Sequence, residues 1–134
     1  MDGLMPEIDL PEGLAEVIAA FYRYEAALVA NDIAALDDFF WDSPLAVRYG
    51  VTENLYGRAA IASFRRSRAV PAGASRQLSD TVITTYGRDY ATAHTLFRWQ
   101  GSLRVGRQSQ TWLRTETGWR IVGAHVSYLE SAAH

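Results

Sequence analysis

The sequence has 134 residues, with 13 Arg, no Lys, no Cys, 15 acidic side chains and a formal net charge of −2 at pH 7. A chain of this length can bury a hydrophobic core on folding, and without Cys it has neither disulfides nor a thiolate metal site. The near-neutral charge argues against a nucleic-acid partner, and no apolar run approaches the roughly 20 residues of a membrane span. We therefore expect one cytoplasmic domain over residues 1–134, with an ordered core over about 11–130 and no signal peptide.

A long helix is predicted at the start of this core. Pro11 suits the first turn of a helix, and from residue 14 to 29 the apolar positions keep helical spacing. Placing successive residues about 100° apart puts Tyr24 and Glu25 on the same stripe as the apolar side chains. Glu25 is therefore expected to point inward, where a leucine would be typical.

Two shorter helices are predicted to follow. The Asn-Asp pair at 31–32 can end the first helix and cap a second over 33–40. A third is predicted over about 58–68, where Ile61, Phe64, Arg65 and Arg68 recur at helical spacing on one face. Between them lie a short extended segment, 45–49, and a loop bracketed by glycines at 50 and 57.

The second half of the chain has the composition of strands. Runs rich in Thr, Val, Ile, Tyr and Trp are separated by short glycine-containing turns, which is typical of hairpins. The predicted strands cover about 76–86, 90–100, 102–115 and 119–129, with turns at 87–89, 100–101 and 117–118. Helices followed by an antiparallel meander predict an α+β fold in which three N-terminal helices pack in a curved, mainly antiparallel sheet.

Several segments carry a family resemblance. They include FYRYEAAL at 21–28, VRYG at 47–50, TENLYG at 52–57 and WRIVGAHVS at 119–127. Over about residues 11–130 the chain resembles the oxalurate-catabolism family, called HpxZ in purine breakdown, and its relative AtzH in cyanuric-acid breakdown. These belong to the nuclear-transport-factor-2-like superfamily, with ketosteroid isomerases and SnoaL-type cyclases. The resemblance implies a cone-shaped roll with a pocket at its open end, and a homodimer.

The resemblance also implies a reaction. It points to hydrolysis of a carboxylated urea, such as a 1,3-dicarboxyurea giving an allophanate-like product, or of an oxalurate-related acid. The residues proposed as catalytic in AtzH-like proteins match Tyr24 and Arg48 here. An amidase-type hydrolase is implied for the preceding step, as a pathway link and not as a demonstrated binding partner.

Arg48 and Tyr24 can also be interpreted from their surroundings. Arg48 follows an apolar run, 45–47, that should enter the core, so it needs a carboxylate from the protein or from a ligand. It could form a structural ion pair with Glu25, bind a substrate carboxylate, or do both. Tyr24 could be a core residue with a satisfied hydroxyl group, or a proton donor or acceptor beside Arg48.

His125 is the third candidate catalytic residue. It lies in the last predicted strand on the same face as Gly123 and Ser127, either as a hydrogen-bonded core residue or as a proton-transfer group at the pocket wall. Because the only other histidines are His94 and His134, no metal site built from histidine is expected.

Other side chains are expected to bind the substrate. Gln110 and Trp112 alternate onto one strand face with Gln108, where a sheet surface or a dimer contact is the alternative to a pocket wall. Arg65 and Arg68 could add positive charge at the pocket mouth or be exposed. The full expected set is Glu25, Phe40, Trp41, Phe64, Arg65, Arg68, Gln110, Trp112 and Ser127. Trp99 and Tyr128 are expected on the outer sheet face, where they would suit a homodimer.

No phosphate loop, dinucleotide fingerprint or nucleophile elbow is present, so no cofactor is expected. The sequence therefore predicts a cofactor-free amidohydrolase acting on a small anionic ureido compound. The main alternative is a non-catalytic ligand-binding or accessory protein to an amidase. An isomerase or dehydratase of an apolar ring would need a carboxylate base in an apolar pocket, a role open only to Glu25.

Overall fold

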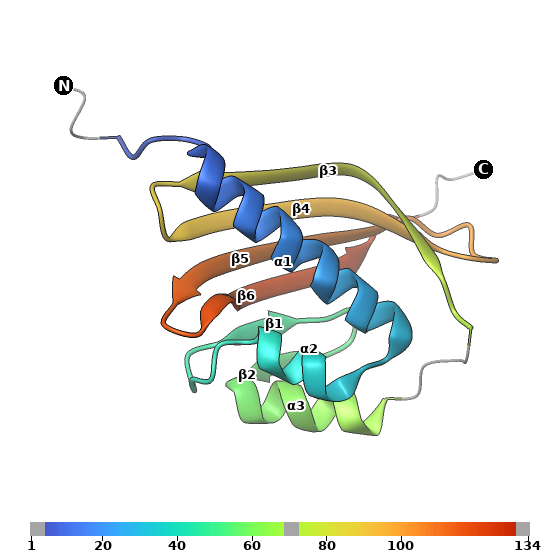
Figure 1. Ribbon diagram of the computed structural model, residues 1–134. Helices are drawn as coiled ribbons and strands as arrows, with labels where there is room; N and C mark the ends of the chain where they lie inside the picture. Colours follow the sequence, from blue (N-terminus) through green and yellow to red (C-terminus); the bar gives the residue numbers. More distant parts are fainter. Residues whose placement is uncertain (1–4, 69–72, 131–134) are drawn as a thin grey trace.

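A computed structural model describes residues 5–68 and 73–130, which form three helices and one six-stranded sheet. The helices are α1 (Pro11–Ala30), α2 (Ile33–Phe39) and α3 (Arg58–Ser67). The strands are β1 (Val47–Tyr49), β2 (Asn54–Tyr56), β3 (Arg76–Tyr86), β4 (Tyr90–Trp99), β5 (Gly106–Thr115) and β6 (Gly118–Tyr128). Figure 1 shows α1 lying along one face of the sheet, with α2 and α3 near the end formed by β1 and β2.

The helix ends follow from local chemistry. Pro11 is the first residue of α1, as predicted. Asn31 adopts a left-handed conformation with φ of 54° and ends the helix, and the carboxylate of Asp32 accepts a hydrogen bond from the Ala35 amide at 3.2 Å and caps α2. None of the described helices is both long enough and apolar enough to cross a membrane.

The core lies between α1 and the sheet. Val17, Phe21 and Tyr24 on the inner stripe of α1 are almost fully buried, and they face the equally buried Trp112 and Ile121 from β5 and β6. Aromatic rings and branched side chains of this size dominate the burial energy of a small domain. The predicted inner stripe of α1 is confirmed.

The sheet has the order β2-β1-β6-β5-β4-β3 and is antiparallel except for the pairing of β1 with β6. The predicted α+β class and mainly antiparallel sheet are confirmed. Two details differ from the prediction. Residues 54–56 form a strand where a loop is predicted, because the Gly50 amide donates to the Glu53 carbonyl at 2.9 Å and closes a tight hairpin. The third long strand begins at residue 106 instead of 102, so residues 100–105 connect β4 to β5.

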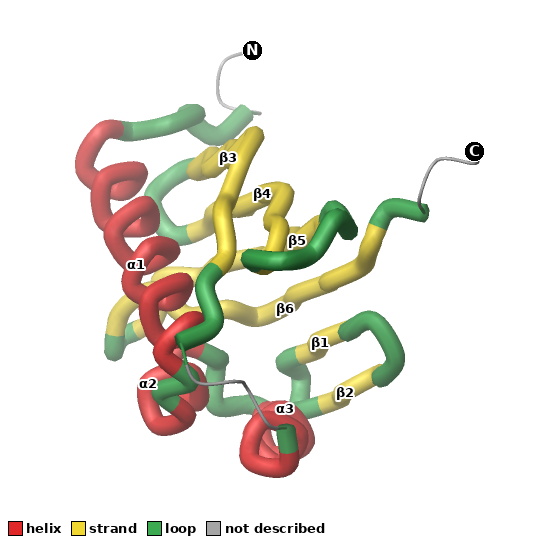
Figure 2. The backbone as a smooth tube through the Cα atoms, turned by 90° about the vertical axis from the view of Figure 1, so that its right-hand side faces the viewer, coloured by secondary structure: helices red, strands yellow, loops and turns green. Residues whose placement is uncertain are grey.

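Two bulges bend the long strands. β3 has one extra residue between Ser79 and Val82, and β6 has an extra residue, Val122, where Ile121 and Gly123 face consecutive residues of β5. A bulge increases the local twist of a strand. Because it adds one residue, it also reverses which positions, odd or even, point to a given face beyond it. Figure 2 shows the resulting curve of the sheet around the α1 side.

Candidate functional site

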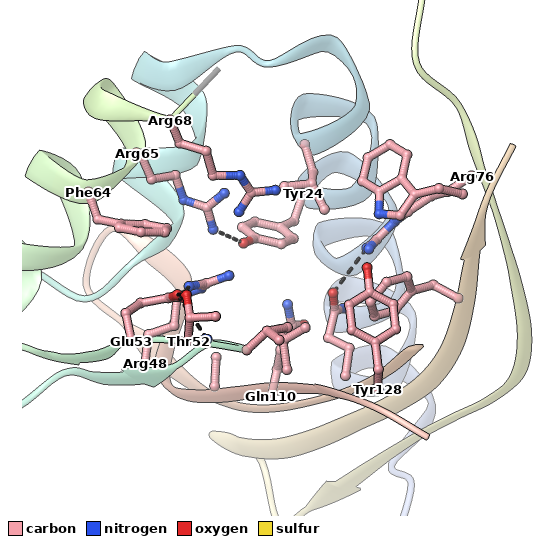
Figure 3. A pocket seen from close by; sticks show the side chains of 17 residues that line it. Tyr24, Arg48, Thr52, Glu53, Phe64, Arg65, Arg68, Arg76, Gln110 and Tyr128 are labelled. Carbon is pink, nitrogen blue, oxygen red and sulfur yellow. Dashed lines mark hydrogen bonds and ion pairs between the residues drawn. The ribbon is translucent and has the colours of Figure 1, made fainter. Parts of the chain in front are cut away.

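A pocket of about 250 Å³ opens between α1, α3, the β1–β2 hairpin and the inner face of the long strands. Four arginines line it, Arg48, Arg65, Arg68 and Arg76. In the view of Figure 3 the first three lie at one end and Arg76 lies at the other, near Tyr128. Apolar walls come from Leu28, Phe64, Phe97 and Val126.

Tyr24 and Arg65 meet inside this pocket. The Nη2 of Arg65 donates a hydrogen bond to the Tyr24 hydroxyl group, and the two residues are almost fully buried, Tyr24 with 4% and Arg65 with 5% of its surface exposed. The Tyr24 ring is held by edge-on contacts with Phe39, Phe40 and Trp112. The Arg65 Nε has no hydrogen-bond partner among the described residues. Tyr24 is therefore a rigid phenol next to a buried cation.

Arg48 has a carboxylate partner, and that partner is Glu53. The Nη1 of Arg48 donates to Glu53 at 2.9 Å, so the ion pair with Glu25, one of the alternatives open for Arg48, is not formed. Glu53 can fold back because residue 50 is glycine: a Cβ there would lie 1.4 Å from the Glu53 Oε2. Thr52 completes the contact, since its hydroxyl group donates to the other carboxylate oxygen at 2.8 Å.

These contacts change the acidity of Glu53. Burial alone would raise the pKa of the Glu53 carboxyl group. The hydrogen bonds from Thr52 and Arg48 and the positive charge of Arg48 outweigh burial and hold that pKa below its usual value of 4.5. Glu53 is thus an ionised partner of Arg48 at neutral pH.

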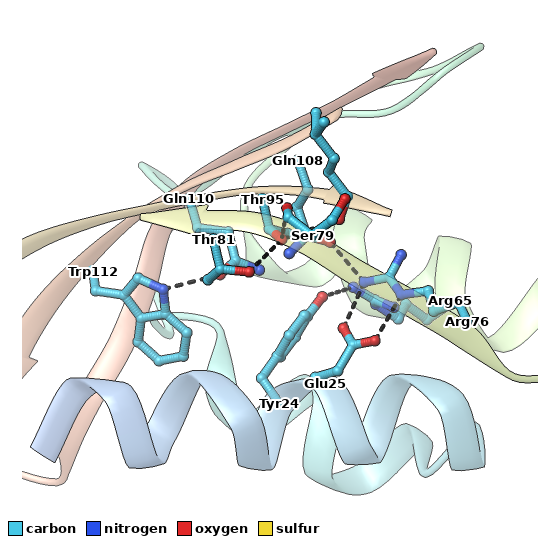
Figure 4. A network of polar contacts seen from close by, with 11 residues as sticks. Tyr24, Glu25, Arg65, Arg76, Ser79, Thr81, Thr95, Gln108, Gln110 and Trp112 are labelled. Carbon is cyan, nitrogen blue, oxygen red and sulfur yellow. Dashed lines mark hydrogen bonds and ion pairs between the residues drawn. The ribbon is translucent and has the colours of Figure 1, made fainter. Parts of the chain in front are cut away.

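Glu25 points inward, as its place on the helix predicts, but it meets Arg76. The two form a double hydrogen bond with distances of 2.8 and 2.6 Å (Figure 4). The Arg76 guanidinium group also stacks 4.4 Å from the Phe97 ring centre. Glu25 is not among the residues that line the pocket. The structure therefore pairs Glu25 with Arg76 outside the pocket wall, and not where the predicted substrate contact or a base for an apolar ring would lie.

Arg65 and Arg68 differ from the other two arginines. No carboxylate of residues 5–68 and 73–130 lies within 4 Å of either one, whereas Arg48 and Arg76 each have a glutamate. Burial and the nearby positive charges of Arg48 and Arg65 lower the pKa of Arg68. This end of the pocket therefore carries excess positive charge.

The glutamines of β5 face the pocket as predicted. Gln108 and Gln110 line it, and both are almost fully buried. The indole nitrogen of Trp112 donates to the Gln110 side-chain oxygen at 3.0 Å. Trp112 itself is buried behind this wall and is not a lining residue, so it supports the site without contacting a ligand.

His125 and Ser127 are not in the pocket. His125 is exposed and packs edge-on against Tyr49 in a shallow hollow on the opposite face of the sheet. The predicted pocket-wall role fails because the extra residue Val122 reverses the alternation of β6. After the bulge, the even-numbered Ala124 and Val126 line the pocket.

Four aromatic residues also lie elsewhere than predicted. Phe40 is a buried core residue against Tyr24, and Trp41 lines a separate hollow with Arg58. Both are therefore wrong as lining residues of the arginine-rich pocket. Trp99 and Tyr128 are expected on the outer sheet face, but they line the pocket.

Sequence reasoning missed Glu53 and Arg76. The signal for Glu53 was the Gly-x-Thr-Glu spacing after β1, which allows a tight turn that folds the carboxylate back. Arg76 lies at the start of β3, and nothing local to that strand indicates that its partner is on α1. In the described part of the chain, no three His, Asp or Glu side chains gather where they could hold a metal ion.

Comparisons with known proteins place the chain among small proteins of the same fold. The AtzH-like family model matches residues 6–132. A protein with unknown function from the DUF3225 family of Pectobacterium atrosepticum is 53% identical, with a TM-score of 0.88 over 92% of this chain and 95% of that one. A cystatin-like fold protein from Burkholderia xenovorans is 45% identical, with a TM-score of 0.87 over 94% of this chain and 98% of that one.

A more distant likeness concerns the fold alone. An NTF2-like protein of unknown function from Pseudomonas putida is 17% identical, with a TM-score of 0.79 over 90% of this chain and 89% of that one. No curated protein matches the chain. The fold is therefore of the cystatin-like, NTF2-like type.

Proposed function

The chain belongs to the AtzH-like family, and from that premise we propose that it is a cofactor-free hydrolase of a small ureido acid that carries two carboxylates. The family resemblance suggests a 1,3-dicarboxyurea as the substrate and an allophanate-like acid as the product. The contact between Tyr24 and Arg65 inside a pocket with excess positive charge is the observation that carries the proposal.

The charges support a dianionic ligand. Glu53 and Glu25 offset the charges of Arg48 and Arg76, which leaves two arginines, Arg65 and Arg68, without a carboxylate among the described residues. Buried positive charge without a partner is unfavourable, so two negative charges on a ligand would be favourable here. An arginine guanidinium group is suited to a carboxylate because its planar N–H groups match the two oxygens.

In the proposed reaction, the bond between a urea nitrogen and its terminal carboxyl carbon breaks. Water supplies an oxygen to that carbon, which leaves as bicarbonate, and the nitrogen keeps the electron pair and takes a proton. Tyr24 delivers this proton, and Arg65 stabilises the phenolate that remains until the water proton returns. Arg48 and Arg68 hold the carboxylates and polarise the carbonyl group.

The test is to incubate the purified protein with 1,3-dicarboxyurea, allophanate and oxalurate while carbon dioxide and ammonia are followed. We expect carbon dioxide from the dicarboxylated urea and loss of this turnover in Tyr24→Phe. Tyr22→Phe, a change to an exposed tyrosine on the same helix, is the matched control. If no compound is turned over but ligands bind, the protein is a ligand-binding or accessory protein instead.

A further inference from the structure

Gln108 and Gln110 are two residues apart on β5 and therefore point to the same face. Both line the pocket and are at least 96% buried, with exposed fractions of 4% and 3%. Figure 4 shows both side chains reaching from the sheet toward Tyr24 and Arg65. A buried amide group at a pocket wall has to be satisfied by the protein or by what binds there.

The orientation of both amide groups is determined by their neighbours. The Nη2 of Arg76 donates to the Gln108 Oε1 at 3.0 Å, and the Nε1 of Trp112 donates to the Gln110 Oε1 at 3.0 Å. Arginine and tryptophan nitrogens can only donate, so reversing either amide would set one N–H against another. Each glutamine is thus held with its oxygen occupied by a donor and its amide nitrogen directed away from that donor.

The nitrogen of Gln108 lacks a partner inside the protein. Its Nε2 is buried and has no hydrogen-bond acceptor among the described residues. Because Trp112 takes the oxygen of Gln110, the amide nitrogen is the atom that Gln110 can offer the pocket. At this wall the Gln108 nitrogen has no acceptor among the described residues, and the Gln110 nitrogen is the amide atom not engaged by Trp112.

We propose that the Gln108 and Gln110 nitrogens form a donor pair that binds an end of the ligand bearing only oxygens, a carboxylate, and discriminates against a carboxamide. This inference rests on the proposed function for the location of the ligand. A carboxylate offers an acceptor to each nitrogen. A carboxamide satisfies one nitrogen and sets its own NH₂ group against the other.

The donor pair also gives the reaction a direction. Removing one terminal carboxyl group from a dicarboxylated urea replaces an oxygen-only end with an amino end. The amino N–H groups of the product then meet the amide N–H groups of the two glutamines, so the product binds less well than the substrate. Arg76 and Trp112 act in this as positioning residues, since they orient the two glutamines.

The test uses equilibrium binding of two unreactive probes, so that it does not depend on turnover. Glutarate has the five-atom chain length of a 1,3-dicarboxylated urea, and glutaramate differs by having one carboxamide end. By titration calorimetry of the wild type at pH 7 we expect glutarate to bind about tenfold more tightly than glutaramate or better. Gln108→Glu keeps an oxygen for Arg76 but turns a second oxygen toward the ligand. It should reduce the preference for glutarate by about tenfold or more.

Gln77→Glu is the matched control, because it adds the same charge one residue from Arg76 at an exposed position, and it should keep the wild-type preference. Trp112→Phe frees the Gln110 amide to reverse and should weaken the preference in the same direction. Equal affinity of the two probes for the wild type, or an unchanged preference in Gln108→Glu, would overturn the donor pair alone. Failure of both probes to bind would overturn the dianionic ligand class together with this inference.

Discussion

The Tyr24 hydroxyl group accepts a hydrogen bond from Arg65, a residue 41 positions away on α3. This contact leaves the phenol proton free to be donated to a ligand, and it puts a cation where a phenolate would need one. Arg48, the arginine expected beside Tyr24, lines the same pocket but is engaged by Glu53.

Replacing Tyr24 by Phe should remove catalysis and leave binding. Loss of a proton-transfer group typically lowers kcat by about 100-fold to 10,000-fold, while the Kd for glutarate should change by less than about threefold. Steady-state kinetics with a dicarboxylated urea and calorimetry with glutarate measure the two effects. A variant that keeps the wild-type kcat would remove Tyr24 from the mechanism.

Glu53→Gln should tighten the binding of an anionic ligand. Glu53 competes with a ligand carboxylate for Arg48 at 2.9 Å, and the amide would compete less because it carries no charge. A decrease in the glutarate Kd of about threefold to tenfold is expected for one partly exposed ion pair. Asp42→Asn removes a charge from an exposed carboxylate outside the pocket and should leave the Kd unchanged.

The same glutamate should make stability depend on pH. The pKa of Glu53 is lowered in the folded protein, so the unfolded chain binds its proton more readily and acid favours unfolding. The stabilisation by Glu53 is present above its unfolded pKa, near 4.5, and is lost as the pH falls through its lower folded pKa.

Urea unfolding at several pH values between neutral and acid would measure this effect in the wild type and in Glu53→Gln. The difference in unfolding free energy between the two proteins should shrink as the pH falls below about 4.5. A difference that stays constant over this range would contradict the ion pair with Arg48.

Arg68→Gln should stabilise the protein in the absence of ligand. Burial first, and then the nearby charges of Arg48 and Arg65, lower the pKa of Arg68, so removing its charge relieves desolvation and repulsion. An increase in unfolding free energy of up to about 1 kcal/mol is expected for a partly exposed charge. The increase in Tm caused by saturating glutarate should be smaller in this variant, and thermal unfolding with and without glutarate measures both effects.

Much of the fold could be predicted because its signals are local. The cap at Asp32, the stripe of α1 and the four long strands each follow from neighbouring residues. The pairing of β1 with β6 could not be predicted, since a parallel contact between strands about 75 residues apart leaves no local pattern.

The site was harder to predict because it depends on which residues meet across the fold. Helical spacing correctly places Tyr24 and Glu25 inside, but their partners, Arg65 and Arg76, lie on other elements. His125 was misplaced because strict alternation along β6 ignores the single extra residue Val122. Strand patterns show that residues alternate, and they do not show where the alternation changes phase.

The bulge at Val122 means that the pairing register of β6, as much as its amino acids, determines the pocket wall. The strand carries two interleaved sets of side chains, one of which includes Ala124 and Val126 and the other His125 and Ser127. Deleting Val122 would remove the bulge and leave both sets on their present faces, because Ile121 and Gly123 already pair with consecutive residues of β5. The two sets would exchange if Val122 entered the regular pairing in the place of Gly123. An evolving or engineered relative whose last strand pairs without the bulge would therefore turn the histidine toward the pocket with no change in the amino acids that follow.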